Sequence, residues 1–314
     1  MSLARTIGLA AMVAAIAAAP RDARAQAATA TGSSPVVDPQ HQPVLGEVEP
    51  TLHWHYPHFG IANYALTGAS LAVAIGSSVA PVAPWRWSGA TGLDETVRDS
   101  IGLQAFNARR TAADVSDVLL AGTLTFPFLF DALTTAWSRR GSGTVAQQMM
   151  AIDLETLAVA GAVTSLTSSL VSRERPYATN NLCETQLGPT HRDCQLEFRF
   201  RYRSFFSGHT SLSFTAASLV CMHHLNLHLY GGSGDTAACV AAMTAASATG
   251  TLRVMADVHY ATDVLAGAAM GTLIGLGVPW LFHYRHKTPH THGALAPNVS
   301  IVPNPTGVSL VGTF

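Results

Sequence analysis

The chain has 314 residues, enough for one large domain or two small ones, and 48% of them are hydrophobic. Only 12% are charged, about half the share of an ordinary soluble domain, and the mean hydropathy is positive at +0.24. The 18 basic and 19 acidic residues nearly cancel, which argues against nucleic acid as a partner. The composition favours a membrane or a very apolar helical core, in which any anion site is local.

The N-terminal region contains two expected segments without catalytic features. Arg5, the Ala-rich stretch from Ile7 to Ala19 and the small residues up to Ala27 predict a signal peptide over residues 1–27. An uncleaved anchor or a misassigned start are the alternatives. Residues 28–57 are polar without apolar periodicity, which predicts an extended exported linker. Because no second ligand cluster supports a metal site, we expect surface histidines at His53, His55 and His58.

Six apolar segments follow, and most are long enough to cross a bilayer as helices. Between the first two, the mixed charged and apolar residues from Leu93 to Asp117 predict one amphipathic helix. We expect an all-α, six-helix bundle over residues 58–286, embedded in or associated with a membrane, and a polar tail over 287–314 with one or two short strands. The apolar segments are Ile61–Val82, Val118–Trp137, Val145–Val171, His209–Leu229, Thr236–Leu252 and Val264–Phe282.

Full membrane embedding meets two difficulties. Asp131, Asp153 and Glu155 lie inside apolar segments, which is costly in lipid unless they face the bundle interior. If the signal is cleaved and every segment spans, three crossings carry the loop after Val171 to the cytoplasm, where disulfides do not persist. Either one segment does not span, or the bundle is a soluble or peripheral exported domain.

The four cysteines fit an exported protein. Cys183 and Cys194 lie in one polar loop, and we predict a disulfide between them. Cys221 and Cys239 flank the turn at residues 231–234. Antiparallel helices around that turn would bring them together, but two free, buried thiols fit the sequence equally well.

Three blocks concentrate Arg, His and Asp at the ends of segments whose interiors nearly exclude charge. If consecutive helices run antiparallel, all three blocks meet on one face of the bundle. Guanidinium forks and a helix N-terminus are what a bound phosphate needs, so the cluster predicts a phosphate site. Each block alone also fits an ordinary helix end or loop. The blocks are Ser172 to Pro176, Ser204 to His209, and the set Arg253, His259 and Asp263.

As a set, the blocks resemble the type 2 phosphatidic acid phosphatase and vanadium haloperoxidase superfamily. Its pattern is a Lys followed after six residues by Arg-Pro, then Pro-Ser-Gly-His, then Ser-Arg with a His after five residues and an Asp after three more. The resemblance covers about residues 118–282, and the matching positions are Arg175-Pro176, Ser207-Gly208-His209, Arg253, His259 and Asp263.

Three positions depart from the superfamily pattern: Ser168 replaces the Lys, Phe206 the Pro and Leu252 the Ser. The missing Lys removes one phosphate-neutralising charge. Arg173 is a candidate to compensate for it, although two positions along a helix from Arg175 it would point elsewhere.

The resemblance implies a phosphohistidine mechanism without a metal or other cofactor. His259 would attack phosphorus with Asp263 orienting its ring, since four residues make about one helical turn. His209 would donate a proton to the leaving oxygen. The phosphoryl oxygens would be held by Arg175, Ser207, the Gly208 amide and Arg253.

Other charged residues rank lower. Three histidines near the far end of the fourth segment suit interfacial or loop roles: His223, His224 and His228. Three arginines before the second block either line an entrance for an anionic substrate or form a solvated basic loop: Arg199, Arg201 and Arg203.

We therefore expect metal-independent hydrolysis of a phosphomonoester or diphosphate. A lipid phosphate or isoprenoid diphosphate is favoured, because apolar helices would hold a greasy tail beside the site. The alternatives are a broad-specificity soluble acid phosphatase, a vanadium haloperoxidase, or a non-catalytic membrane protein that binds phosphorylated lipid. The signal peptide predicts the cell envelope, with the site on the periplasmic or extracellular side and membrane embedding favoured over a soluble form.

Overall fold

A computed structural model of the chain describes residues 51–82, 87, 89–179, 182–192, 194–195, 200–287, 298–304 and 307–313. The expected signal peptide, most of the expected linker and Arg199 lie outside the described residues.

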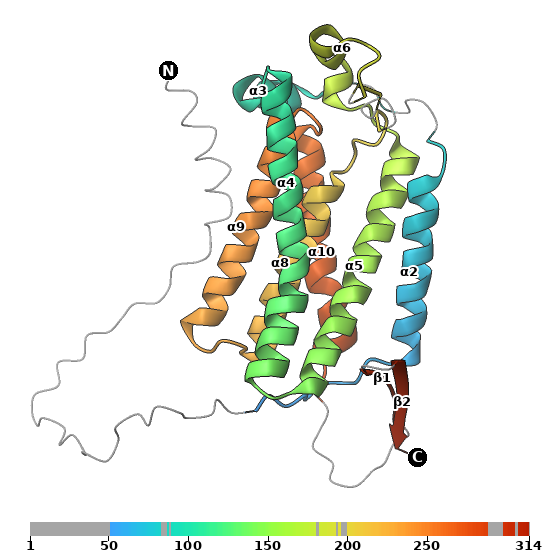
Figure 1. The fold of residues 1–314 in the computed structure, drawn as a ribbon, viewed down its shortest axis with the longest axis vertical. Coiled ribbons are helices and arrows are strands. Elements are labelled where there is room, and N and C mark those ends of the chain that lie inside the picture. The colour runs from blue at the N-terminus through green and yellow to red at the C-terminus, as the bar shows by residue number, and fades with distance from the viewer. Residues whose placement is uncertain are drawn as a thin grey trace, which may run out of the picture.

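The described helices run side by side in one bundle (Figure 1). Five of the six expected apolar segments lie mainly within an α-helix of 19 or more residues, and Val118–Trp137 is divided between α4 and the π-helical turns after it. π-Helical turns extend α4 over Pro127–Arg139 and α10 over Trp280–Tyr284. The long helices are α2 (Ile61–Val79), α4 (Phe106–Phe126), α5 (Gly143–Val171), α8 (Gly208–Leu227), α9 (Ser233–Met255) and α10 (Ala261–Pro279).

The amphipathic segment from Leu93 to Asp117 forms two helices rather than the expected one. The first is α3 (Gly92–Ile101), whose C-cap is Gly102, and the second is the first half of α4. Between them the backbone N–H of Leu103 donates to the Met255 carbonyl at the end of α9 (3.0 Å). A tertiary hydrogen bond therefore takes the place of helix continuity, and α3 covers one end of the bundle (Figure 1).

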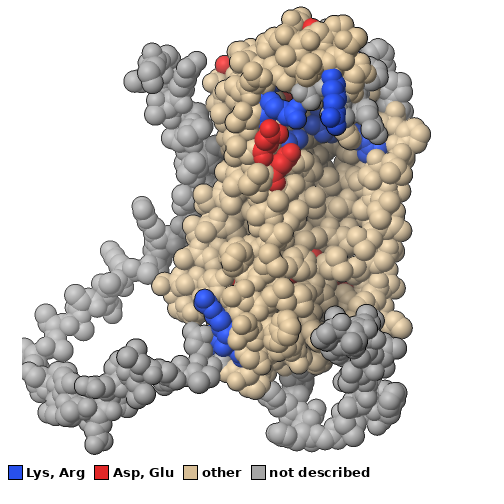
Figure 2. Space-filling view, viewed as in Figure 1, with Lys and Arg blue, Asp and Glu red and all other residues tan. Residues whose placement is uncertain are grey.

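The bundle interior combines small side chains with larger buried apolar ones such as Met149, Ile152 and Leu219, and further large apolar side chains lie on its outside. The central helix α8 packs against α4, α5, α9 and α10, and most of its side chains are buried. Figure 2 shows charged side chains gathered near the end that carries α3 and α6 (Leu182–Leu187), with an almost uncharged surface over the middle of the face in view. Large exposed apolar side chains include Val118, Leu129, Phe130, Leu273, Trp280 and Phe282.

Three helices in the described part of the chain are long and apolar enough to cross a membrane, judged by length and composition. They span Phe106–Arg139, Gly143–Val171 and Ala261–Tyr284. A helix bundle in a membrane is expected to have apolar side chains on its outside and small or polar side chains in its interior.

The acidic residues inside the apolar segments face the bundle interior. Asp131, Asp153 and Glu155 are fully buried, and each contacts a histidine. The interfacial or loop roles expected for His223 and His224 are therefore wrong, whereas the His228 side chain is exposed. The closest pairs are His223 with Asp153 (2.7 Å), His283 with Glu155 (2.6 Å), and His224 with Asp235 (2.6 Å) and Asp131 (3.3 Å).

The segment before the expected domain differs from the sequence analysis, whereas the tail after it agrees. Residues 51–57 were expected to be linker, but Tyr56 is buried and its ring packs edge-on against that of Tyr284 at the end of α10. The expected strands of the tail are present as an antiparallel hairpin of β1 (Asn298–Asn304) and β2 (Gly307–Thr313).

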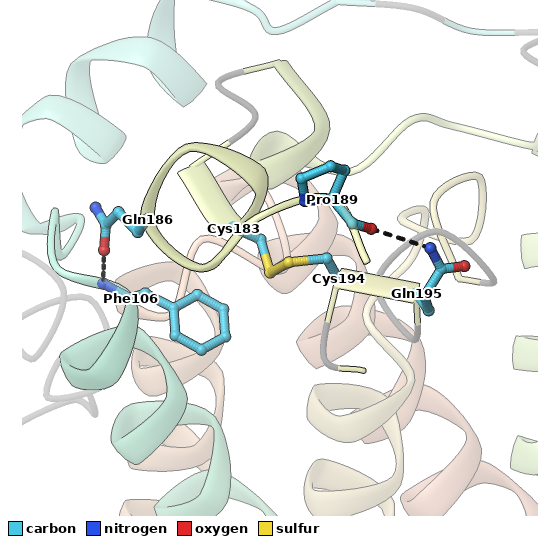
Figure 3. Close-up of a disulfide and its surroundings, with 6 residues drawn as sticks. All are labelled: Phe106, Cys183, Gln186, Pro189, Cys194 and Gln195. Atoms are coloured by element: carbon cyan, nitrogen blue, oxygen red, sulfur yellow. Dashed lines mark hydrogen bonds between the residues drawn. A yellow bond between two sulfur atoms is a disulfide. The ribbon is translucent and has the colours of Figure 1, made fainter. Parts of the chain in front are cut away.

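The structure contains two disulfides. Cys183 is joined to Cys194 beside the Phe106 ring, and the backbone N–H of Phe106 donates to the Gln186 side chain at 2.9 Å (Figure 3). The hydrogen bond between Phe106 and Gln186 connects α6 to the start of α4. Cys221 of α8 is joined to Cys239 of α9, which resolves the alternative that the sequence left open.

Glycines on α10 allow it to approach α8 closely. A Cβ atom at Gly267 would lie 2.7 Å from the Ser207 carbonyl, and one at Gly271 would clash with the Ser211 carbonyl. Because Ser207 is at the start of α8, this contact also positions the loop that enters the helix.

Replacing Gly271 with Ala should lower the stability of the bundle by about 1–3 kcal/mol, because the added methyl meets backbone atoms that cannot move aside. Gly277→Ala is the matched control, since nothing lies within 4 Å of a Cβ there and Ala favours the helix. Thermal unfolding in detergent, followed by circular dichroism, should show a lower Tm for Gly271→Ala alone. Equal Tm values for the two variants would contradict the packing described.

Candidate active site

The structure brings the three motif blocks together at the end of the bundle covered by α3. The Arg175 guanidinium donates to the Val258 carbonyl at 3.4 Å, which links the first block to the third. The second and third blocks meet twice. The Ser204 carbonyl lies 2.8 Å from Nδ1 of His259, and the Ser207 backbone N–H donates to the Asp263 carbonyl at 3.0 Å.

Two guanidiniums of this cluster have unused hydrogen-bonding capacity. The buried Nε atoms of Arg175 and Arg253 find no hydrogen-bond partner among the described residues. Arg253 binds Ser116 at 3.1 Å and one oxygen of Asp117 at 3.2 Å, both from α4. Burial and then the charge of Arg175 lower the pKa of Arg253 to about 10. An excess of buried positive charge favours an anionic ligand.

The start of α8 adds backbone donors to the same place. Ser207 is the N-cap, and its Oγ accepts from the backbone N–H of Thr210 at 3.4 Å. A Cβ at Gly208 would lie 3.3 Å from a methyl group of Thr164, so a larger residue there would press on α5. The first amides of a helix have no intrahelical partners and point outward, which suits a phosphate oxygen.

His209 follows in the first turn of α8. Its Nε2 lies 2.8 Å from Oδ1 of Asp117, whose side chain is 57% exposed. Burial and then the charge of Arg253 lower the pKa of His209 to about 4, although Asp117 opposes the shift. Asp117 thus contacts both His209 and Arg253, and no sequence pattern indicated it.

His259 is buried, and its ring orientation is set by a carbonyl. Its Nδ1 lies 2.8 Å from the Ser204 carbonyl, which only accepts hydrogen bonds, so Nδ1 carries the hydrogen and Nε2 carries the lone pair. The nearest Asp263 oxygen is 3.8 Å from Nδ1, beyond hydrogen-bonding distance. In this structure the Ser204 carbonyl accepts the Nδ1 hydrogen and Asp263 supplies a nearby negative charge, so the orienting role expected for Asp263 stays a prediction.

The same surroundings keep His259 neutral. Burial and then the charge of Arg175 lower its pKa to about 3, even though Asp263 favours the charged form. A neutral imidazole with a fixed Nε2 lone pair is the state that a nucleophile needs.

Arg173 does not replace the missing lysine. Its fully buried guanidinium binds Asp263 at 2.6 Å and Asp94 at 2.7 Å. The same group lies between the rings of Trp87 and Tyr260, 4.1 Å from each centroid. Its charge is therefore committed to two carboxylates, and the interpretation of Arg173 as a compensating phosphate ligand is wrong.

Asp94 is a second residue that the sequence analysis missed. It belongs to a capping box at the start of α3, where it accepts from the Thr91 backbone N–H (3.0 Å), and it also accepts from the Thr262 N–H (2.9 Å). Burial raises its pKa, but these hydrogen bonds and Arg173 outweigh burial and bring the pKa to about 2. The Thr-x-x-Asp spacing predicts the cap, whereas its partner Arg173 lies 79 positions away.

Comparisons with known proteins agree with the motif blocks. The family model of the PAP2 superfamily matches residues 151–287. The matched region is just under half of the chain and is similar to a PAP2 superfamily domain. The resemblance inferred from the spacing of the blocks is thereby confirmed.

Two known proteins are similar to parts of this chain. A lipid A 1-phosphatase of Porphyromonas gingivalis is 43% identical over 86 residues, which are 27% of this chain and 18% of that protein, so the match spans less than a fifth of the relative. A transmembrane PAP2 type phosphatidylglycerolphosphate phosphatase of Bacillus subtilis shares 17% identity, with 68% of this chain and 84% of that chain covered. Its TM-score of 0.32 is too low to support an argument from the overall fold.

The excess positive charge at Arg175 and Arg253 predicts that inorganic phosphate stabilises the protein in the presence of a chelator. Phosphate at a hundred times its Kd should add about 2.7 kcal/mol to the free energy of unfolding. Sodium chloride of equal ionic strength should not, and Arg253→Gln should remove most of the gain in Tm. Arg110→Gln is the control, because Arg110 is exposed and pairs with Asp114. An equal phosphate effect on both variants would argue against an anion site at Arg253.

Proposed function

We propose that this protein hydrolyses a phosphomonoester or diphosphate of a lipid through a phosphohistidine at His259, without a metal. The observation that carries the proposal is the state of His259: it is buried and neutral, and its Nε2 lone pair is fixed by the Ser204 carbonyl. The unused Nε donors of Arg175 and Arg253 support a phosphoryl group as the electrophile beside it.

In the first step, Nε2 of His259 attacks phosphorus and the bond from phosphorus to the leaving oxygen breaks. The leaving oxygen takes a proton from His209, which becomes neutral. The imidazole becomes a positively charged phosphoimidazolium, and the nearby carboxylate of Asp263 stabilises it. Arg175, Arg253 and the first amides of α8 hold the equatorial oxygens as charge shifts toward the leaving group.

In the second step, a water molecule attacks phosphorus from the side that the product alcohol has left. His209, now neutral, accepts the proton of the water, the bond from phosphorus to Nε2 breaks, and inorganic phosphate is formed. The electron pair returns to Nε2 and both histidines regain their starting states.

Asp117 changes partners during this cycle. In the structure one of its oxygens contacts both His209 and Arg253. A bound phosphoryl group competes for Arg253, and its negative charge favours the protonated form of His209. Substrate binding therefore brings the proton donor into its active charge state.

A lipid substrate fits the outside of the bundle. Three helices are suited to span a membrane, and the site lies at one end of the bundle, where a phosphorylated headgroup would meet it. The activity named for the Porphyromonas gingivalis relative supports a lipid phosphate as the substrate class. Because Cys183 is paired with Cys194 at the site end, that end would face an oxidising, exported compartment.

Brief mixing with substrate followed by an alkaline quench should trap an acid-labile phosphoramidate on His259. His259→Ala should abolish turnover, with a loss of at least about 1,000-fold, because no other group replaces the nucleophile. Phosphopeptide mapping and phosphate release in the presence of a chelator measure the two effects.

His228→Ala is the control for this experiment, since His228 is exposed and lies at the opposite end of α8. It should keep the parent rate. Full turnover by His259→Ala would refute the mechanism whatever the family relationship.

The two histidine pKa values predict an acid pH optimum. Deprotonation of His259 is complete above its pKa of about 3, whereas protonated His209 is lost as pH rises through its pKa of about 4. We therefore expect kcat/KM to fall between pH 5 and pH 8. The fall in kcat at basic pH should lie at higher pH than the fall in kcat/KM, because the bound phosphoryl group raises the pKa of His209. A kcat/KM that rises from pH 5 to pH 8 would contradict the assignment of His209 as the acid.

A further inference from the structure

The superfamily pattern requires a cation at position 168, and the structure shows none there. Ser168 lies in the last turn of α5, is 8% exposed, and its hydroxyl donates to the Ser165 carbonyl at 3.2 Å. Arg173 cannot supply the charge, because it is committed to Asp94 and Asp263. The phosphate site thus requires another source of positive charge, or it functions with one charge fewer.

Arg203 lies beside this same turn of α5. Its guanidinium donates to Oγ of Ser169 at 3.0 Å and to the carbonyls of Ser77 and Ala80 at 3.1 and 2.8 Å. All of these partners are neutral, and no carboxylate among the described residues pairs with Arg203. By contrast, Arg201, two positions earlier, is neutralised by Glu174 at 2.6 Å.

Arg203 is also close to the phosphate-binding cluster. Its carbonyl accepts a hydrogen bond from the Arg175 guanidinium at 3.2 Å, and the next residue is Ser204, which orients His259. Burial and then the charge of Arg175 lower the pKa of Arg203. Two like charges with no acid between them are stabilised by an anion that interacts with both.

We propose that Arg203 supplies, from the loop before α8, the phosphate-neutralising charge that the superfamily lysine would supply from position 168. The inference rests on the proposed function and names a further residue of the same site. Position 168 lies on α5, whereas Arg203 lies on the loop before α8. In this proposal the site keeps its positive charge, but a residue of a different element carries it.

A purely structural role is the competing explanation. Two of the Arg203 contacts are to carbonyls at the end of α2, so Arg203 also acts as a cap for that helix. A cap needs the forked donors of a guanidinium, whereas a charge needs only a cation. Variants that separate the two properties therefore decide between the roles.

The test compares Arg203→Gln, Arg203→Lys and the control Arg201→Gln in the full chain. Inorganic phosphate binding is measured by calorimetry, and KM is measured with a short-chain lipid phosphate. We expect Arg203→Gln to weaken phosphate binding and raise KM by roughly tenfold or more. Arg203→Lys should stay within about threefold of the parent, and Arg201→Gln within about twofold.

Restoring the lysine completes the test. Ser168→Lys in the Arg203→Gln background should recover most of the lost phosphate affinity, whereas in the parent it should change little because the charge is already present. If Ser168→Lys restores phosphate binding to Arg203→Gln but does not restore its Tm, the missing charge explains the lost binding and the missing helix cap explains the lower Tm. Unchanged phosphate affinity in Arg203→Gln would overturn the proposal, and so would a failure of Ser168→Lys to rescue a folded Arg203→Gln protein.

The design keeps this inference separate from the proposed function. Calorimetric phosphate binding needs no turnover, so a parent protein that binds phosphate without hydrolysing substrate would refute the function and leave the role of Arg203 measurable. If Arg203→Gln does not fold, Arg203→Lys decides: loss of phosphate affinity in a folded Arg203→Lys protein would overturn the proposal.

Discussion

The arrangement of the site depends on the two ion pairs made by the fully buried guanidinium of Arg173. They join the end of α5 to Asp94 of α3 and to Asp263 of α10, three elements far apart in the sequence. Removing one partner of such a buried pair costs about 3–5 kcal/mol, because a charge is left without compensation. Two carboxylates share this one cation, so the cluster has spare negative charge beside His259. That charge is what a phosphoimidazolium at His259 requires.

The two ends of the bundle show why buried histidines and acids alone do not indicate a catalytic site. At the far end, acids and histidines contact each other directly, as in the pair of His223 with Asp153. At the site end the balance is reversed, because Arg175, Arg203 and Arg253 are accompanied mainly by the half-exposed Asp117. The excess of positive charge, rather than the residue types, distinguishes the end that we propose to bind phosphate.

Apolar periodicity and motif spacing predicted the long helices and the convergence of the three blocks, because both are local properties of the chain. They could not predict the break after Ile101, which depends on a hydrogen bond from Leu103 to the end of α9. They also could not show that His223 faces the interior, since an apolar segment does not reveal which side lipid covers. Asp117 and Asp94 were missed for the same reason: each acts through partners about 80 to 170 positions away.

At two of the departures from the superfamily pattern, other elements of the fold make contacts beside the changed residue. Phe206 lacks the restraint of a proline ring, but the loop before α8 is held by Ser204, whose backbone N–H donates to the Arg173 carbonyl at 3.0 Å and whose hydroxyl donates to Asp263. Leu252 has no hydroxyl, and Arg253 donates to the hydroxyl of Ser116 of α4. A motif residue is therefore replaceable when its contact can be supplied from elsewhere. The proposed nucleophile could not be supplied in this way, because its lone pair must lie at one point, and this chain has His259 there.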